Sequence, residues 1–161
     1  MASGDTLYTH LARASSPPSS NAAPMGRRNG IDLLSIDVGE ATLFLFGMPR
    51  HYAGGGVTLT FRLMTAAAAT GNVKLGAQFS RLDGVDIDDY TFADLKTTAD
   101  VAVPTSGSGV EFQTPLIVAN GSEMDGIVGG SLGVLRVSRE AATTDEAVGD
   151  LQLIAVEMRE T

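Results

Sequence analysis

Apolar and polar residues alternate along two central stretches of the chain. In residues 57–63 and again in residues 73–79, every second side chain is apolar. Because successive side chains of a β-strand point to opposite faces, both stretches predict strands that bury one face. The small-residue run 66–70 and the pair Gly71-Asn72 lie between them. We therefore interpret the two as a hairpin with a long connection.

Turn signals such as Asp83-Gly84 and Asn120-Gly121 separate further stretches that are rich in apolar and β-branched residues. Strands are predicted in residues 33–37, 41–46, 97–103, 110–118, 132–139 and 150–159. The pattern favours a short helix only in residues 90–95. About eight strands with little helix are typical of an all-β fold, and they predict a two-sheet antiparallel sandwich of the jelly-roll type.

The first thirty residues differ from the rest of the chain. The run SSPPSSNAAPMGRRNG has paired prolines and only scattered apolar side chains, so it cannot fill a core by itself. We therefore divide the chain into an extended N-terminal arm, residues 1–30, and a β-sandwich domain, residues 31–161.

Charge suggests what the arm contacts. The whole chain carries a formal charge of −8. Within the arm, Arg13, Arg27 and Arg28 outweigh Asp5, so the arm carries +2 and the body −10. We expect this basic arm to reach onto an acidic neighbouring subunit, with the three arginines in contact with the partner. The alternative is an N-terminal tail ordered along its own domain.

Composition also narrows the classes of partner and cofactor. An acidic chain is a poor match for nucleic acid, because phosphate binding needs a basic face. The chain has no cysteine, which rules out disulfides and thiolate metal sites. It shows neither an apolar signal region nor eighteen continuous apolar residues, so we expect neither a signal peptide nor a membrane span. No cofactor is expected.

The search for catalytic residues gives little support for an enzyme. Ser131 lies in a G-x-S-x-G sequence, but the residues after it read as a strand, whereas a nucleophile elbow requires a helix there. We interpret this segment as a turn. The two histidines, His10 and His51, are far apart in sequence and are expected at the surface or an interface.

The acidic run 83–89 contains the candidate cation ligands Asp83, Asp86 and Asp88. Carboxylates at this spacing in a loop can converge on Ca²⁺, but the order of residues differs from an EF-hand loop. The alternative is a solvated loop whose aspartates cap turns or begin the short helix.

The stretch FGMPRHYAGGGVTLTFRLMTAAAATGNVKLGAQFSRLDG, residues 46–84, resembles virion proteins of tailed bacteriophages. In these proteins a Met-Pro-x-x-Tyr-x-Gly-Gly-Gly segment leads into an alternating strand. Residues 135–139 and 153–160 are similar too, so the resemblance extends from about residue 40 to the C-terminus.

The resemblance implies a jelly-roll-like capsid decoration, or cement, protein. Such a protein sits on the outside of the virion, commonly as a homotrimer, and bridges subunits of the major capsid protein. No functional residues follow from it. The alternative is a virion module that binds a receptor or a glycan, since jelly rolls also serve as lectin domains. The chain has no tryptophan and three tyrosines, which offers few rings for sugar binding. A small hydrolase built on Ser131 is the third hypothesis.

Overall fold

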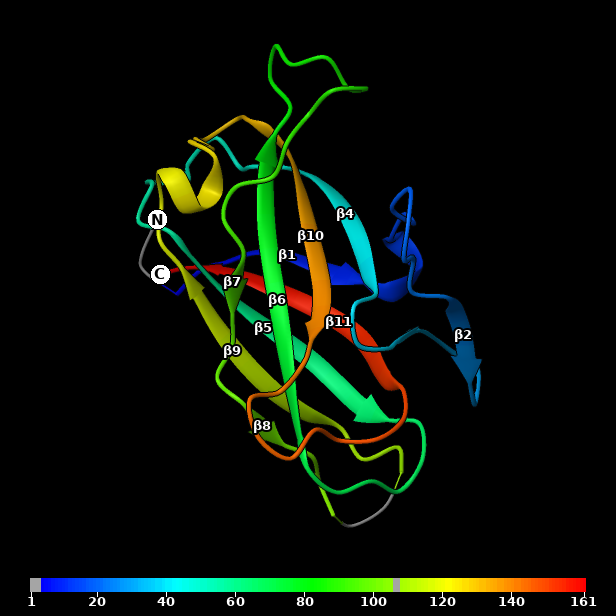
Figure 1. Cartoon of the computed structure of the whole chain (residues 1–161). Helices are drawn as coiled ribbons and strands as arrows, with labels where there is room; N and C mark the ends of the chain where they lie inside the picture. Colours follow the sequence, from blue (N-terminus) through cyan, green and yellow to red (C-terminus); the bar gives the residue numbers. More distant parts are fainter. Residues whose placement is uncertain (1–3, 106–107) are drawn as a thin grey trace.

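The computed structural model describes residues 4–105 and 108–161. Within them, eleven strands form two antiparallel sheets that pack face to face (Figure 1). Sheet A holds, in this order, β2 (Met25–Arg28), β3 (Ile31–Ile36), β11 (Leu151–Glu160), β5 (Val57–Thr65) and β9 (Phe112–Val118), and β1 (Thr6–Leu11) also pairs with β11. Sheet B holds β4 (Ala41–Gly47), β10 (Leu132–Glu140), β6 (Asn72–Arg81) and β7 (Lys96–Thr97), and β8 (Val101–Ala102) also pairs with β6.

This architecture confirms the predicted jelly-roll-like sandwich. The described helices are two short 3-10 turns, η1 (Ala12–Ala14) and η2 (Ser122–Met124). None of the helices in the described ranges has the length and apolar character that a membrane span requires.

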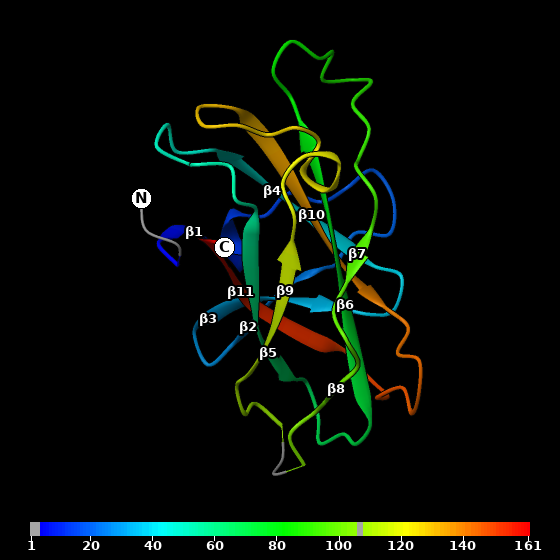
Figure 2. The same ribbon diagram turned by 90° about the vertical axis from the view of Figure 1, so that its left-hand side faces the viewer.

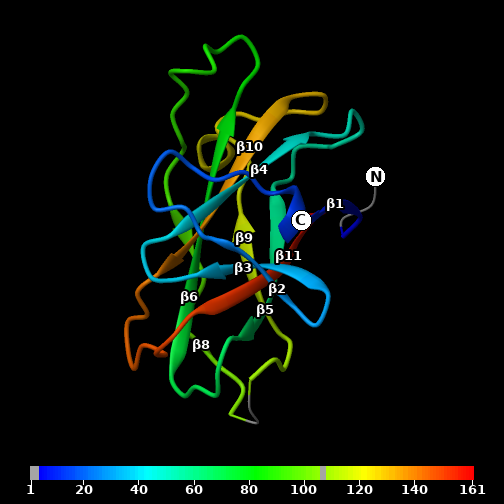
Figure 3. The same cartoon turned by 90° about the vertical axis from the view of Figure 1, so that its right-hand side faces the viewer.

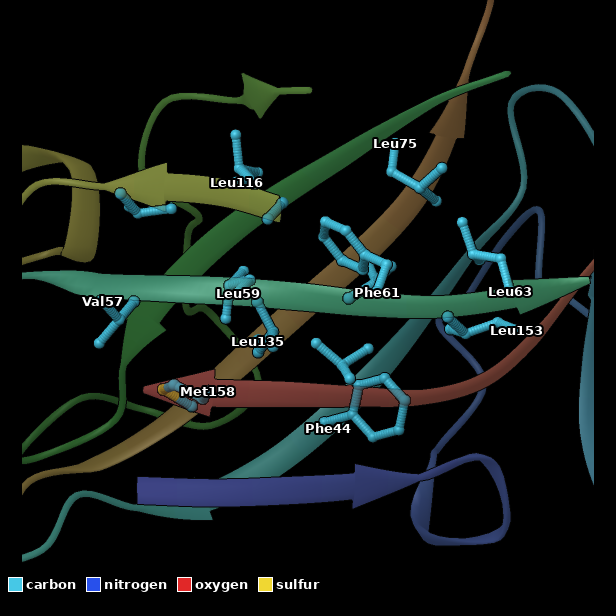
Figure 4. Packing of buried hydrophobic residues seen from close by; sticks show 14 of the residues in the cluster. Phe44, Val57, Leu59, Phe61, Leu63, Leu75, Leu116, Leu135, Leu153 and Met158 are labelled. Carbon is cyan, nitrogen blue, oxygen red and sulfur yellow. The ribbon is translucent and has the colours of Figure 1, made fainter. Parts of the chain in front are cut away.

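The core lies between the two sheets. The four alternating apolar residues of β5, from Val57 to Leu63, are fully buried, and so are Leu75 and Phe79 of β6. Figure 4 shows the β5 side chains and Leu75 in one cluster with labelled side chains of β4, β10 and β11. The rings of Phe46 and Phe79 meet edge to face with their centroids 6.0 Å apart. The period-two pattern thus identified both strands and the faces that they bury.

The predicted hairpin of β5 and β6 is wrong. β5 pairs with β11 and β9 in sheet A, whereas β6 pairs with β10 in sheet B. The two strands lie in different layers, as Figure 2 shows. Their connection is long enough to cross between the sheets, so the two apolar faces pack against each other instead of lying side by side.

The described part of the N-terminal segment lies along its own domain. β1 pairs with β11 from Thr6 to Leu11, and Ser16 exchanges two backbone hydrogen bonds with Leu43 at the edge of β4. Ala12 and Ala23 are buried in the core. This placement is the alternative to an arm that reaches onto a neighbour. Unpaired backbone groups on an open strand edge can bind a segment that has few apolar side chains. Such pairing cannot be predicted from the amino-acid composition of the segment.

Two local predictions also change. Residues 90–95 are not helical, and Ala93 bonds to Phe79 with an N–O distance of 2.8 Å. The predicted strand at 97–103 is broken into β7 and β8, which both pair with β6. The sequence Ser106-Gly107-Ser108-Gly109 is a further turn signal, and it lies partly outside the described residues.

Candidate functional site

A groove with a volume of about 590 Å³ lies on the outer face of sheet B. The N-terminal segment, residues 17–20, forms one wall, and the loop between β6 and β7 forms the other with residues from Ile87 to Phe92. Leu43 and Arg136 form the floor. In Figure 3 the blue N-terminal loop and the green loop above β6 border the same side of the sandwich.

The floor follows from strand register. Arg136 of β10 lies opposite Leu43 of β4 on one side and Gln78 of β6 on the other. These three residues therefore form one row across the sheet. Their neighbours Phe44 and Leu135 are fully buried in the core, so the alternation of a strand directs the row outward.

A chain of hydrogen bonds orders the floor and the adjacent loop. Nη1 of Arg136 donates to Oε1 of Gln78 at 2.5 Å. Nε2 of the same glutamine donates to the carbonyl oxygen of Ala93 at 3.0 Å. Gln78 therefore links the arginine to the loop and fixes its own amide orientation. In the described parts of the chain, Arg136 makes no ion pair with an acidic residue.

The loop wall supplies aromatic and acidic groups. The rings of Tyr90 and Phe92 pack edge to face, with centroids 5.4 Å apart, and both line the groove while half-buried. Asp88 lines the groove as well. Aromatic faces, a guanidinium and a carboxylate thus meet above one sheet. This combination suits a flat ligand with apolar ring faces and hydroxyl groups at its edges.

A second hollow, of about 490 Å³, surrounds Ser131 at one end of the sandwich. The serine is buried, and its Oγ accepts a hydrogen bond from the backbone N–H of Val128 at 3.2 Å. Strand β10 begins at the next residue, so the interpretation of this segment as a turn is confirmed. Arg50 and Arg81 line the hollow, but neither histidine does.

The two histidines have different surroundings. The surface placement expected for His10 is wrong, because β1 turns this side chain into the core. Its ring stacks on Tyr8 at 5.4 Å with an interplanar angle of 11° and lies 5.2 Å from the ring of Phe44. Burial lowers the pKa of His10 from 6.5 to about 4. His51 is exposed, as expected.

The three candidate cation ligands do not come together. Asp83 accepts hydrogen bonds from the N–H of Leu132 and from Nε of Arg81, both at 2.9 Å. These two bonds, the first above all, hold the pKa of Asp83 below its usual value. Asp86 accepts the N–H of Asp88 at 3.0 Å and so stabilises a turn. No cluster of three or more His, Cys, Asp or Glu in residues 4–105 and 108–161 could hold a metal ion.

The three arginines assigned to a partner are placed differently from one another. Arg28 donates to the carbonyl oxygen of Thr65 at 3.1 Å and to the side chain of Gln152 at 3.2 Å, which ties β2 to β5 and β11. Arg27 pairs with Asp32 on the neighbouring strand at 2.8 Å. Arg13 is exposed beside a small hollow between η1 and β3. Contact of these arginines with a partner stays a prediction.

Sequence reasoning missed the groove. Gln78 appeared only as a polar position of an alternating strand, and Arg136 as part of a strand. The alternation of apolar and polar residues in the two strands predicts that both side chains point away from the core. This is the only local signal for the floor of the groove. That they share a row depends on the register between distant strands, and the expected helix at 90–95 obscured the loop that brings Tyr90 and Phe92 to the wall.

Comparison with known proteins supports the fold. No protein-family model matches this sequence, and no curated protein matches it. Among solved structures, the CBM22-1–CBM22-2 tandem domain of a Paenibacillus barcinonensis protein has a TM-score of 0.55 at 12% identity. The match covers 100% of this chain but 46% of the tandem, so the chain spans about half its length.

Two single domains are similar over nearly their whole length. The CBM22-2 xylan-binding domain from the same organism has a TM-score of 0.51 at 11% identity, with 96% of this chain and 99% of that domain covered. The xylan-binding module CBM15 has a TM-score of 0.51 at 6% identity, with 96% and 97% covered. Because the sequence identities are this low, the structural similarity shows a shared sandwich fold and nothing more.

Proposed function

We propose that this protein is a carbohydrate-binding β-sandwich module that holds a sugar chain in the groove on sheet B. The observation that carries the proposal is the groove itself, which Tyr90 and Phe92 line together with an Arg136 that is ordered by its hydrogen bond to Gln78. Structures described as xylan-binding share the fold and support the same class of ligand.

The physical requirements of sugar binding match these residues. A pyranose ring has an apolar face of C–H groups and a polar edge of hydroxyls, so it gains from an aromatic surface beside hydrogen-bonding groups. The groove of about 590 Å³ falls within the range of roughly 300–1,000 Å³ that is common for small-ligand sites. Tyr90 and Phe92 provide the surface, and Arg136, Asp88 and the hydroxyl of Tyr90 provide the polar groups.

We propose binding without catalysis. Glycoside hydrolysis ordinarily uses two carboxyl groups on opposite sides of the bond that is cleaved. Asp88 is the acidic residue that lines the groove among the residues described, and it has no acidic counterpart across the floor. The charged residue on the floor is the cationic Arg136.

Affinity electrophoresis tests this proposal. We expect the protein to be retarded by at least one soluble β-linked polysaccharide in a panel that includes xylan. Tyr90→Ala should weaken that retardation about tenfold, corresponding to roughly 1.4 kcal/mol of lost contact. Ile117→Ala is the matched control, because this side chain is 66% exposed on sheet A. Free migration in every polysaccharide, or equal retardation of Tyr90→Ala, would contradict the proposal.

A second candidate function is that of a homotrimeric decoration protein on a phage capsid. One observation favours it besides the resemblance of residues 46–84. Leu11 and Ile31 are 44% and 55% exposed and flank a hollow that Arg13 also lines. An apolar patch beside a cation suits contact with an acidic protein surface such as that of a major capsid protein.

The test uses purified heads of the virus that encodes the chain. Arg13→Glu combined with Ile31→Asp should reduce occupancy on the heads, while Tyr90→Ala should leave it unchanged. Undiminished occupancy of the double variant would contradict capsid binding through this patch.

A further inference from the structure

We infer that the groove selects sugar chains that carry isolated uronic acid residues, with Arg136 as the residue that binds the carboxylate. This inference rests on the proposed carbohydrate-binding function and names the chemical class of its ligand. It depends on the charge of the floor, the geometry of the arginine and the acidity of the surrounding wall.

The first step is the uncompensated charge of Arg136. Its hydrogen-bond partner in the described structure is the neutral amide oxygen of Gln78, which orients the guanidinium without neutralising it. A guanidinium has five N–H donors, so several remain for a ligand. An arginine in this state binds a carboxylate through two parallel hydrogen bonds, a geometry that a sugar hydroxyl cannot provide.

The second step is the setting of that charge on the sheet. The neighbouring row across sheet B consists of Leu45, Val134 and Ser80, none of which is charged. Leu43 lies directly beside the arginine in its own row. The row on the other side consists of Ala41, Ser138 and Gly76, and there the hydroxyl of Ser138 donates to Oε1 of Glu140 at 2.5 Å. Arg136 is the one cation among the described residues that line the groove, and the walls of the groove shield it partly from water. These surroundings strengthen its attraction for a single anionic group.

The third step limits the number of carboxylates. The wall contributes Asp88, the loop that forms it is acidic from Asp83 onward, and the chain carries −8 overall. A polyanion would be repelled by this field at every position except Arg136. The ligand that fits is a largely neutral chain with one uronic acid among several uncharged sugars, whose ring faces stack on Tyr90.

Isothermal titration with glucuronoxylan, before and after chemical reduction of its carboxyl groups, tests the inference. We expect carboxyl reduction to weaken binding to the wild-type protein about tenfold, the effect of roughly 1.4 kcal/mol from a charge-assisted pair. Arg136→Gln should bind both forms equally, at the level of the reduced polysaccharide. Arg136→Lys should retain part of the preference, because it keeps the charge and loses the planar fork. Polygalacturonate should not bind.

Arg27→Gln is the matched control, since this arginine lies on β2 in sheet A and should leave the preference intact. Thermal unfolding of each variant checks that the sandwich is folded. Equal wild-type affinity for the two forms, or a preference that survives in a folded Arg136→Gln, overturns the carboxylate inference and leaves sugar binding standing. Tight binding of polygalacturonate overturns the limit to isolated carboxylates. Failure to bind any form overturns the proposed function as well.

Discussion

Arg139 and Glu146 form an ion pair at one end of the sandwich, with Nη2 of the arginine 2.8 Å from Oε1 of the glutamate. The arginine is only 1% exposed. It also donates to the carbonyl oxygens of Ala147 at 2.7 Å and Gly149 at 2.6 Å. The buried side chain therefore anchors the loop between β10 and β11 to the body.

Glu146→Ala should lower the free energy of unfolding by about 2 kcal/mol, because it removes the nearer counter-charge of a buried guanidinium and leaves only Asp37, whose Oδ1 lies 3.9 Å from Nη1. The loss is smaller than for a fully buried pair, since the glutamate is partly exposed. Urea denaturation measures it. Asp32→Ala, which removes the exposed pair with Arg27, should cost less than about 1 kcal/mol. Equal losses in the two variants would contradict the anchoring role.

His10 should make the fold sensitive to acid. Burial lowers the pKa of this histidine from 6.5 to about 4, so between these values the unfolded chain binds a proton that the folded chain does not. Stability contributed by the neutral ring is complete above pH 6.5 and is lost as the pH falls toward 4. The loss amounts to about 3 kcal/mol at about 1.36 kcal/mol per pKa unit.

Denaturation from pH 7.5 to 4 compares His10→Phe with the wild-type protein. In the variant, the free energy of unfolding should no longer fall by this amount between pH 6.5 and 4, because phenylalanine packs on Tyr8 without taking up a proton. His51→Gln is the control, and its profile should follow that of the wild type. A His10→Phe profile parallel to the wild type would show that the acid sensitivity originates in other groups.

Gly56 permits a close approach between the start of β5 and the end of β9. Its φ is +95°, and an added Cβ would lie 2.6 Å from the carbonyl oxygen of Val118. Gly56→Ala should therefore cost more than about 3 kcal/mol, from backbone strain together with displacement of β9. Gly39 has a similar φ of +86° with open space around it, so Gly39→Ala should cost about 1 kcal/mol. Thermal unfolding of the two variants measures both losses of stability. The loss in Gly39→Ala reports the backbone strain alone, and the additional loss in Gly56→Ala reports the steric clash with Val118.

Deletion of residues 1–24 should damage the sandwich as well as any contact with a partner. The deletion removes β1 from the edge of β11 and uncovers the core beside Phe44 and Phe46. We expect a loss of at least about 3 kcal/mol in the free energy of unfolding. Amides of residues 155–159 should exchange hydrogen faster, while those of 57–63 stay protected. Unchanged exchange in both segments would contradict a structural role for this part of the chain.

Alternation in the sequence located most strands of this sandwich. Residues 57–63 and 73–79 form β5 and β6 with their apolar side chains buried, and residues 132–139 and 150–159 form β10 and β11. A strand that buries one face has an apolar residue at every second position, so the local sequence pattern is sufficient to predict the strand and its buried face. The same reasoning placed Ser131 in a turn, because a strand follows it.

The pairing of the strands depends on contacts between distant segments, and the local sequence pattern does not predict these contacts. The assignment of β5 and β6 to opposite sheets, the docking of β1 on β11 and the row of Leu43, Arg136 and Gln78 all join segments far apart in the chain. Register depends on which edges are free and which faces must be buried together. The groove exists only in that register, since a shift by one residue would turn Arg136 into the core and remove the floor.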